Sequence, residues 1–173
     1  GSHTLTINNS GGNTTFAGFF TGDGNIIRQG THNLNVNNLS SGFTGVLTVD
    51  SGMFQMSNIG QINASVIRIN KGGALIFDNN GTTRSGARVL DNTTITLNSA
   101  DGTFQGQTIV RGLAIRTDQD GTLDETVGTI NFNTGASYIG MGTGGTNDDS
   151  DIISSDLVRL NSSTMNVRGT ALG

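Results

Sequence analysis

The segment from Gly22 to Asn58 constrains the fold most, because it contains four short runs of alternating apolar and polar residues separated by glycine- and asparagine-rich turns. The runs span residues 25–28, 33–37, 46–49 and 53–56. Their apolar residues lie two positions apart, as Leu47 and Val49 do, and this spacing places side chains on one face of a strand. Each run is too short for a helix and too narrow to bury its apolar edge alone. We therefore expect pairs of strands to stack as coils of a β-solenoid around one shared core.

The same pattern recurs along the chain. The leading strands are centred near Ile26, Leu47, Ile67, Ile95, Ile130 and Leu157. Their offsets of about 20 to about 35 residues are typical of solenoid coils with inserted loops. The sequence thus predicts an all-β fold, a right-handed parallel β-helix of about seven irregular coils without any helix longer than one turn. The side chains expected to point inward are Ile67/Ile69, Leu75/Phe77, Ile95/Leu97 and Ile130/Phe132.

Strand partners and turns can be assigned from the same pattern. Residues 94–97 are expected to pair with 103–105 as the two strands of one coil. The chain has 27 glycines and no proline, which fits coils whose backbone N–H groups bond to neighbouring coils. Side-chain ladders between adjacent coils are expected for a group of asparagines: Asn131, Asn133, Asn161 and Asn166.

The order GDGNIIRQGTHNLNVNN and then FTGVLTVDSGMFQM, within Gly22 to Asn58, resembles the passenger-associated transport repeat of bacterial autotransporters and other large secreted β-strand-repeat proteins. Thr44-Gly45 and Leu47-Thr48-Val49 are the most specific part of the match. The resemblance implies a structural, non-catalytic segment of an exported or cell-surface bacterial protein. Such a segment extends the chain, assists export by stepwise folding and can contribute to adhesion. Its implied partners are neighbouring repeats of the same chain and extracellular polysaccharide.

Charge and composition disfavour several other partners. The formal net charge is -4, and the nine Lys and Arg residues are dispersed, so a surface that follows nucleic acid or an anionic membrane is not expected. With zero Cys the chain forms no disulfides and no cysteine-bound metal site. Residues 1–3 resemble the remnant of a cleaved tag, and we expect 4–173 to be a single solenoid segment of a longer protein.

One acidic stretch has the composition of a calcium site. Carboxylate oxygens around a glycine turn suit Ca²⁺, and the candidates are Asp118, Asp120, Asp124 and Glu125. The spacing does not fit an EF-hand loop, so a solvated acidic turn is the alternative. A second acidic stretch, residues 147–151, follows a glycine loop and has the same two interpretations. No other cofactor is expected.

Catalytic residues are sparse. A Ser-His-Asp relay would depend on His32, which we expect to be an outward strand residue. Polysaccharide-degrading β-helices use acidic pairs with Arg or Lys, for which the candidates are Asp78, Asp91, Asp101, Arg84, Arg88 and Arg111. These residues follow strands, where Asp also caps the backbone, so a structural role is favoured. We predict that the chain is not an enzyme; the alternative is a carbohydrate-interacting β-helix, either lectin-like or polysaccharide-degrading.

Overall fold

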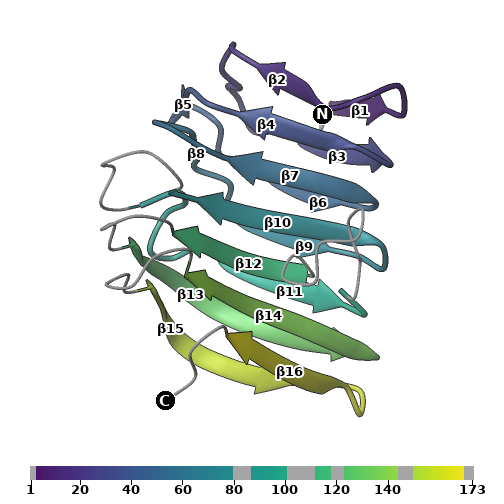
Figure 1. Ribbon diagram of the computed structural model, residues 1–173, viewed down its shortest axis with the longest axis vertical. Helices are drawn as coiled ribbons and strands as arrows, with labels where there is room; N and C mark the ends of the chain where they lie inside the picture. Colours follow the sequence, from purple (N-terminus) through teal and green to yellow (C-terminus); the bar gives the residue numbers. More distant parts are fainter. Residues whose placement is uncertain (1–2, 80–86, 101–111, 118–122, 144–149, 170–173) are drawn as a thin grey trace.

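The computed structural model describes residues 3–79, 87–100, 112–117, 123–143 and 150–169, and these form a parallel β-solenoid of seven coils (Figure 1). The first sheet contains, in spatial order, β1 (Thr4–Asn9), β3 (Asn25–Gly30), β6 (Val46–Val49), β9 (Val66–Ile69), β11 (Thr94–Asn98), β13 (Leu123–Thr134) and β15 (Ser150–Arg159). The second contains β2 (Thr14–Phe16), β4 (Asn33–Val36), β7 (Gly52–Met56), β10 (Gly73–Asp78), β12 (Gly112–Thr117), β14 (Ala136–Thr143) and β16 (Thr164–Gly169). A short third sheet pairs β5 (Leu39–Ser40) with β8 (Gln61–Ile62).

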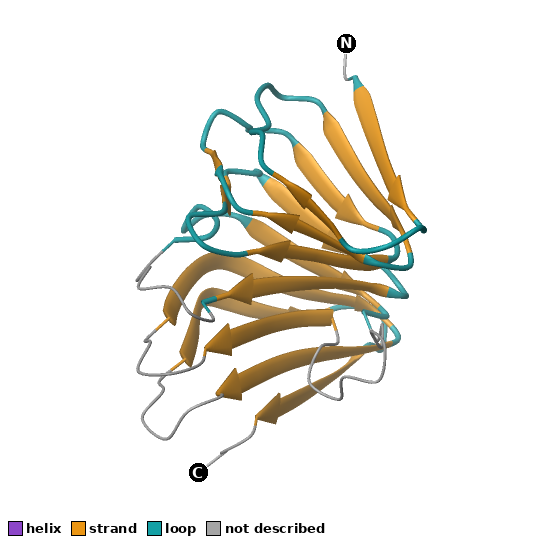
Figure 2. Ribbon diagram, turned by 45° about the horizontal axis from the view of Figure 1, so that its top comes forward, coloured by secondary structure: helices purple, strands orange, loops and turns teal. Residues whose placement is uncertain are grey.

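Each coil contributes one strand to each large sheet (Figure 2). In coils two to four a turn of two or three residues leads from the first sheet to the second. A longer connection then returns the chain to the first sheet, one strand further along. All pairs in both large sheets are parallel, as the stacking of successive coils requires. The described residues contain no helix, as the sequence predicted.

The core consists of columns of inward side chains that continue from coil to coil. Leu47 of β6 pairs with Ile26 of β3 on one side and with Ile67 of β9 on the other, and Ile67 pairs with Ile95. All four side chains are buried. The eight inward residues predicted from the sequence, Ile67/Ile69, Leu75/Phe77, Ile95/Leu97 and Ile130/Phe132, are all buried. The inward and outward assignment of these strands is thus confirmed.

Two expectations of local structure were wrong. The second strand of the fifth coil is β12, which lies between β10 and β14, and not the run at 103–105. That run lies outside the described residues. His32 is in the turn between β3 and β4 and not in a strand; it is half-buried, and its imidazole Nδ1 lies 3.1 Å from the Thr31 hydroxyl. His32 is outside the strand because β3 ends at Gly30 and β4 begins at Asn33.

A second apolar cluster lies on the outward face of the second sheet. Ile76 alternates with the inward Leu75 and Phe77, yet its side chain is also fully buried. It clusters with Met53, Ala74 and Ala114, separately from the main core. Strand alternation alone would have placed these side chains in solvent, so the sequence pattern did not reveal their burial.

The glycine of the Thr44-Gly45 turn is required by close approach between coils. Gly45 packs against the backbone of Gly24, and a Cβ at this position would overlap the Gly24 carbonyl oxygen. That carbonyl accepts a hydrogen bond from the Val46 N–H at 3.2 Å, so it cannot move away without loss. Gly45→Ala should lower the free energy of unfolding by about 1 to 3 kcal/mol.

Urea denaturation of the variant and the wild type measures this effect. Gly11→Ala is the matched control, because a Cβ at Gly11 would meet no atom within 4 Å. We expect that control to stay within about 0.5 kcal/mol of wild type. Equal stabilities of the two variants would contradict the assigned contact between coils.

Candidate functional site

A ladder of polar side chains follows the edge where the first sheet turns into the second. Its members are Gln29, Asp50, Asn70, Asn98, Asn133 and Asn161. Asn70 Nδ2 donates to Asp50 Oδ1 at 2.6 Å, and each of the three following asparagines donates to the preceding one at 2.8 Å. Gln29 Nε2 donates to Asp50 Oδ2 at 3.2 Å. The predicted ladder is confirmed for Asn133 and Asn161, whereas Asn131 and Asn166 are not members of it.

Two arginines occupy one column of the core. Arg28 lies between Ile7 and Val49 in the strand register and is fully buried, and Arg159 follows Phe132 in the same column. Each guanidinium turns back over its own turn: Arg28 Nη2 donates to the His32 carbonyl, and Arg159 Nε donates to the Ser163 carbonyl at 2.6 Å. Burial lowers the pKa of Arg28 to about 10, so the group stays charged at neutral pH.

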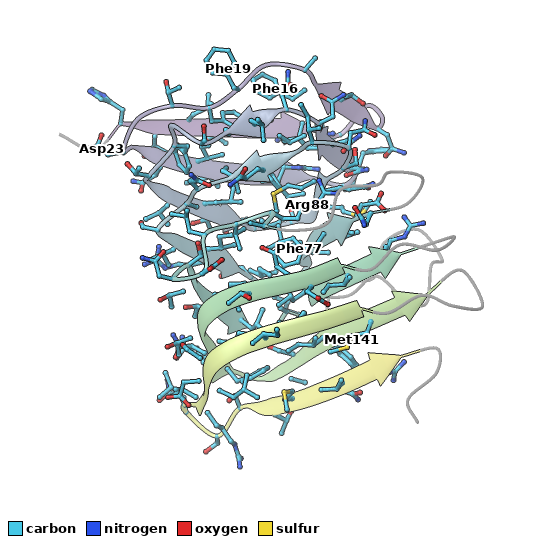
Figure 3. All side chains as sticks on the ribbon, turned by 90° about the vertical axis from the view of Figure 1, so that its left-hand side faces the viewer. Phe16, Phe19, Asp23, Phe77, Arg88 and Met141 are labelled. Atoms are coloured by element: carbon cyan, nitrogen blue, oxygen red, sulfur yellow. The ribbon has the colours of Figure 1, made fainter. Side chains whose placement is uncertain are left out.

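The most elaborate charged cluster is built around Arg88, in the connection between β10 and β11. Its side chain is fully buried. Nη1 donates to the carbonyl oxygens of Asn58 at 2.8 Å and Gly60 at 2.9 Å. Nη2 donates to the carbonyl oxygen of Asp78 at 2.6 Å and to Asn79 Oδ1 at 3.2 Å. The guanidinium therefore joins the connection of coil three to the end of β10 in coil four. Figure 3 labels Arg88 among the side chains of the stack.

Glu125 of β13 holds the backbone of the same connection. Its Oε1 accepts from the N–H groups of Arg88 and Val89, each at 2.9 Å, and Oε2 accepts from the Arg88 N–H at 2.8 Å. The carboxylate is fully buried. Burial raises the pKa of Glu125, and the negative charge of Asp91 adds to this rise; the two N–H groups and the Arg88 charge oppose it.

These hydrogen bonds of Arg88 and Glu125 are made within the chain itself. The Arg88 donors meet main-chain carbonyls and the Asn79 side chain, and the Glu125 oxygens meet main-chain N–H groups. The two charges thus join the connections of coils three and four to strand β13 of coil six. A buried charge is tolerated only when it is hydrogen-bonded in this way. The sequence did contain one signal for Glu125: it lies two positions before the buried Val127 on the same strand face.

Two of the four calcium candidates, Asp124 and Glu125, lie in the described residues, and their side chains point to opposite sides of β13. Asp124 is exposed and Glu125 is buried, because adjacent strand residues point to opposite sides. Asp118 and Asp120 lie outside the described residues, as do 147–149 of the second acidic stretch. Among the described residues there is no group of three or more His, Asp or Glu that could hold a metal ion. Calcium binding by the 118–125 stretch stays a prediction.

Three of the candidates for polysaccharide cleavage, Asp78, Arg88 and Asp91, lie in the described part of the chain. The Asp78 carboxylate is buried and accepts from Gln55, which itself accepts from Asn33 Nδ2 at 2.6 Å. Arg88 is buried among main-chain groups, whereas Asp91 is exposed. Arg84, Asp101 and Arg111 lie outside the described residues.

Glu125 should make stability depend on pH. Its native pKa lies above the usual 4.5, so the native state binds the proton more tightly than the unfolded chain does. The free energy of unfolding should therefore fall as pH rises from about 4 through the native pKa. Glu125→Gln does not titrate, so the difference in unfolding free energy, variant minus wild type, should become more positive over that interval.

Denaturation at a series of pH values measures that difference. Asp124→Asn is the matched control, since it removes the exposed neighbouring carboxylate, and its difference from wild type should vary less. A difference between Glu125→Gln and wild type that is constant from pH 4 to pH 7 would contradict the raised pKa.

No helix in the described residues is long and apolar enough to cross a membrane. No protein-family model, curated protein or solved structure matches this chain.

Proposed function

We propose that this chain is a structural, non-catalytic solenoid segment of an exported or cell-surface bacterial protein. Its task is to extend the chain outward and to assist export by folding one coil upon another. The observation that supports the proposal is that the hydrophobic core and the polar ladder continue from coil to coil. Each coil packs against the next, so added coils lengthen the solenoid along one axis.

The residues that resemble the passenger-associated transport repeat support the proposal. They occupy the second and third coils, from β3 to β7, where the stack is regular in register. Gly45 of that motif lies where two coils touch backbone to backbone. The motif thus contains residues that stacking needs, which is what a repeat with a structural role requires.

The chemistry of the buried charges also supports a structural role over a carbohydrate-cleaving one. Cleavage of a glycosidic bond needs two groups that divide acid and base roles across a groove. Asp78 and Arg88 are instead buried and engaged in bonds within the protein. Neighbouring coils of the same parent chain are the proposed partners, with extracellular polysaccharide as a surface to which the rod adheres.

A panel of polysaccharides, incubated with the full chain with and without calcium, tests the proposal. We expect no product release on any substrate, with or without the ion. Product release that is abolished by Asp91→Asn, the exposed described member of the candidate acids, would overturn the non-catalytic assignment. A calcium-dependent rise in melting temperature without turnover would leave it standing and would place the ion in a stabilising role.

A further inference from the structure

The two ends of the solenoid expose the columns that form the core elsewhere. Leu157 of β15 and Leu5 of β1 belong to the column of Leu47, which is fully buried, yet they are 54% and 50% exposed. The second sheet has its own column of inward side chains, and this column ends with Val167 of β16. Val167 is 39% exposed. These end strands are also the outer strands of the two sheets that the described residues form (Figure 1).

The two end surfaces match each other in direction and register. All strands of each sheet run parallel, so β15 and β16 of one molecule can pair with β1 and β2 of another in the sense that the interior coils use. If the column order is kept, Leu157 of one molecule falls on Leu5 of the next. Counted in that register, Asn161, the last member of the ladder, falls on Asn9, and Leu160 falls on the exposed Asn8, which pairs with Gln29.

The molecule contains an internal precedent for this contact. Arg28 in coil two is buried between Ile7 of coil one and Val49 of coil three. Arg159 in coil seven has the same position in the column and the same bond to the carbonyl four residues later, but it is exposed. Phe132 already covers Arg159 on the side where Ile7 covers Arg28. Stacking coil one of a second molecule on coil seven would place its Ile7 on the other side, where Val49 covers Arg28.

The surface of coil one is also hollowed. A cavity of about 320 Å³ opens beside β1 and is lined in part by Leu5, Phe20, Ile26 and Phe43. Two of its lining residues, Leu5 and Ile26, belong to the column that ends in Leu157 at the other end, whereas Asp23 and Asn25 are polar. Near the cavity, Phe19 is 68% exposed and projects beyond the first coil (Figure 3).

We propose that this chain binds a second copy of itself head to tail, with coil seven of one molecule stacked on coil one of the next. The argument for a second copy is continuity: the contact would pair parallel strand edges, as the coil-to-coil contacts inside the molecule do. Such a contact uses two different surfaces and does not close on itself, so it produces dimers and longer rods as concentration rises. The inference goes beyond the proposed function: neighbouring coils of a parent chain would cover the same two ends, and a second copy is assigned to these ends where no such coil covers them.

The test uses sedimentation and light scattering of the full chain over a range of concentrations. The wild type should shift from monomer mass to multiples of it. Leu5→Lys blocks one end and Leu157→Lys blocks the other, so each variant alone should remain monomeric. An equimolar mixture of the two should reach twice the monomer mass and no more, because one intact end of each kind remains.

Leu39→Lys is the matched control, since Leu39 is an exposed leucine in β5 on the side of the stack, and it should associate as the wild type does. Val167→Lys repeats the block on coil seven in the second sheet, and circular dichroism verifies folding of each variant. The proposal is overturned if the wild type stays monomeric throughout. It is equally overturned if Leu5→Lys or Leu157→Lys alone still associates, or if Leu39→Lys alone abolishes association.

Discussion

Arg88→Ala should lower the free energy of unfolding by about 3 to 5 kcal/mol, one of the two largest effects expected in this protein. The substitution leaves the carbonyl oxygens of Asn58, Gly60 and Asp78 buried without the donor that now serves them. Each lost bond to a charged donor is worth about 1.5 to 3 kcal/mol, though not additively. The Glu125 carboxylate would also lose the nearby positive charge that opposes the rise of its pKa.

Chemical denaturation of Arg88→Ala beside Arg68→Ala measures this effect. Arg68 is an exposed arginine on β9, so its loss should change stability by less than about 0.5 kcal/mol. Arg88→Met keeps much of the side-chain volume and should still be destabilised, which separates the loss of hydrogen bonds from the loss of packing. If Arg88→Ala and Arg68→Ala are equally stable, the proposed role of Arg88 in joining coils is wrong.

Leu47→Ala should lower the free energy of unfolding by about 2 to 5 kcal/mol, because it opens a void that borders the coils on both sides. Leu47 is fully buried between Ile26 and Ile67 in the column. The neighbouring backbone is held by parallel pairing on both sides, so it can collapse only partly into the space. Loss of the side chain is therefore felt in coils two, three and four together.

Thr48→Ala is the natural control, since Thr48 is adjacent, points outward and is only half-buried. Thr48→Ala should lower the free energy of unfolding by well under about 1 kcal/mol. Thermal melts of both variants, with Ile95→Ala as a second buried position, decide the question. Equal melting shifts for Leu47→Ala and Thr48→Ala would contradict the assignment of inside and outside.

The sequence by itself determined most strands of the two large sheets and their inward faces. The reason is local: alternation with a period of two places side chains on one face whatever the strand pairs with, as Ile67/Ile69 and Ile95/Leu97 illustrate. Asparagines after the strands also indicated a ladder, and Asn133 and Asn161 form one. These features require only the geometry of a few consecutive residues and the repetition of that geometry.

Only the tertiary structure decided which segments pair and which polar groups are buried. The second strand of coil five is β12 and not 103–105, because the length of the inserted loop is not encoded in the alternation. Ile76 is buried on the outward face, and Arg88 meets Glu125 across 37 positions of the chain. Burial at such positions depends on residues that come together only when the coils stack, so no short stretch of sequence contains the information.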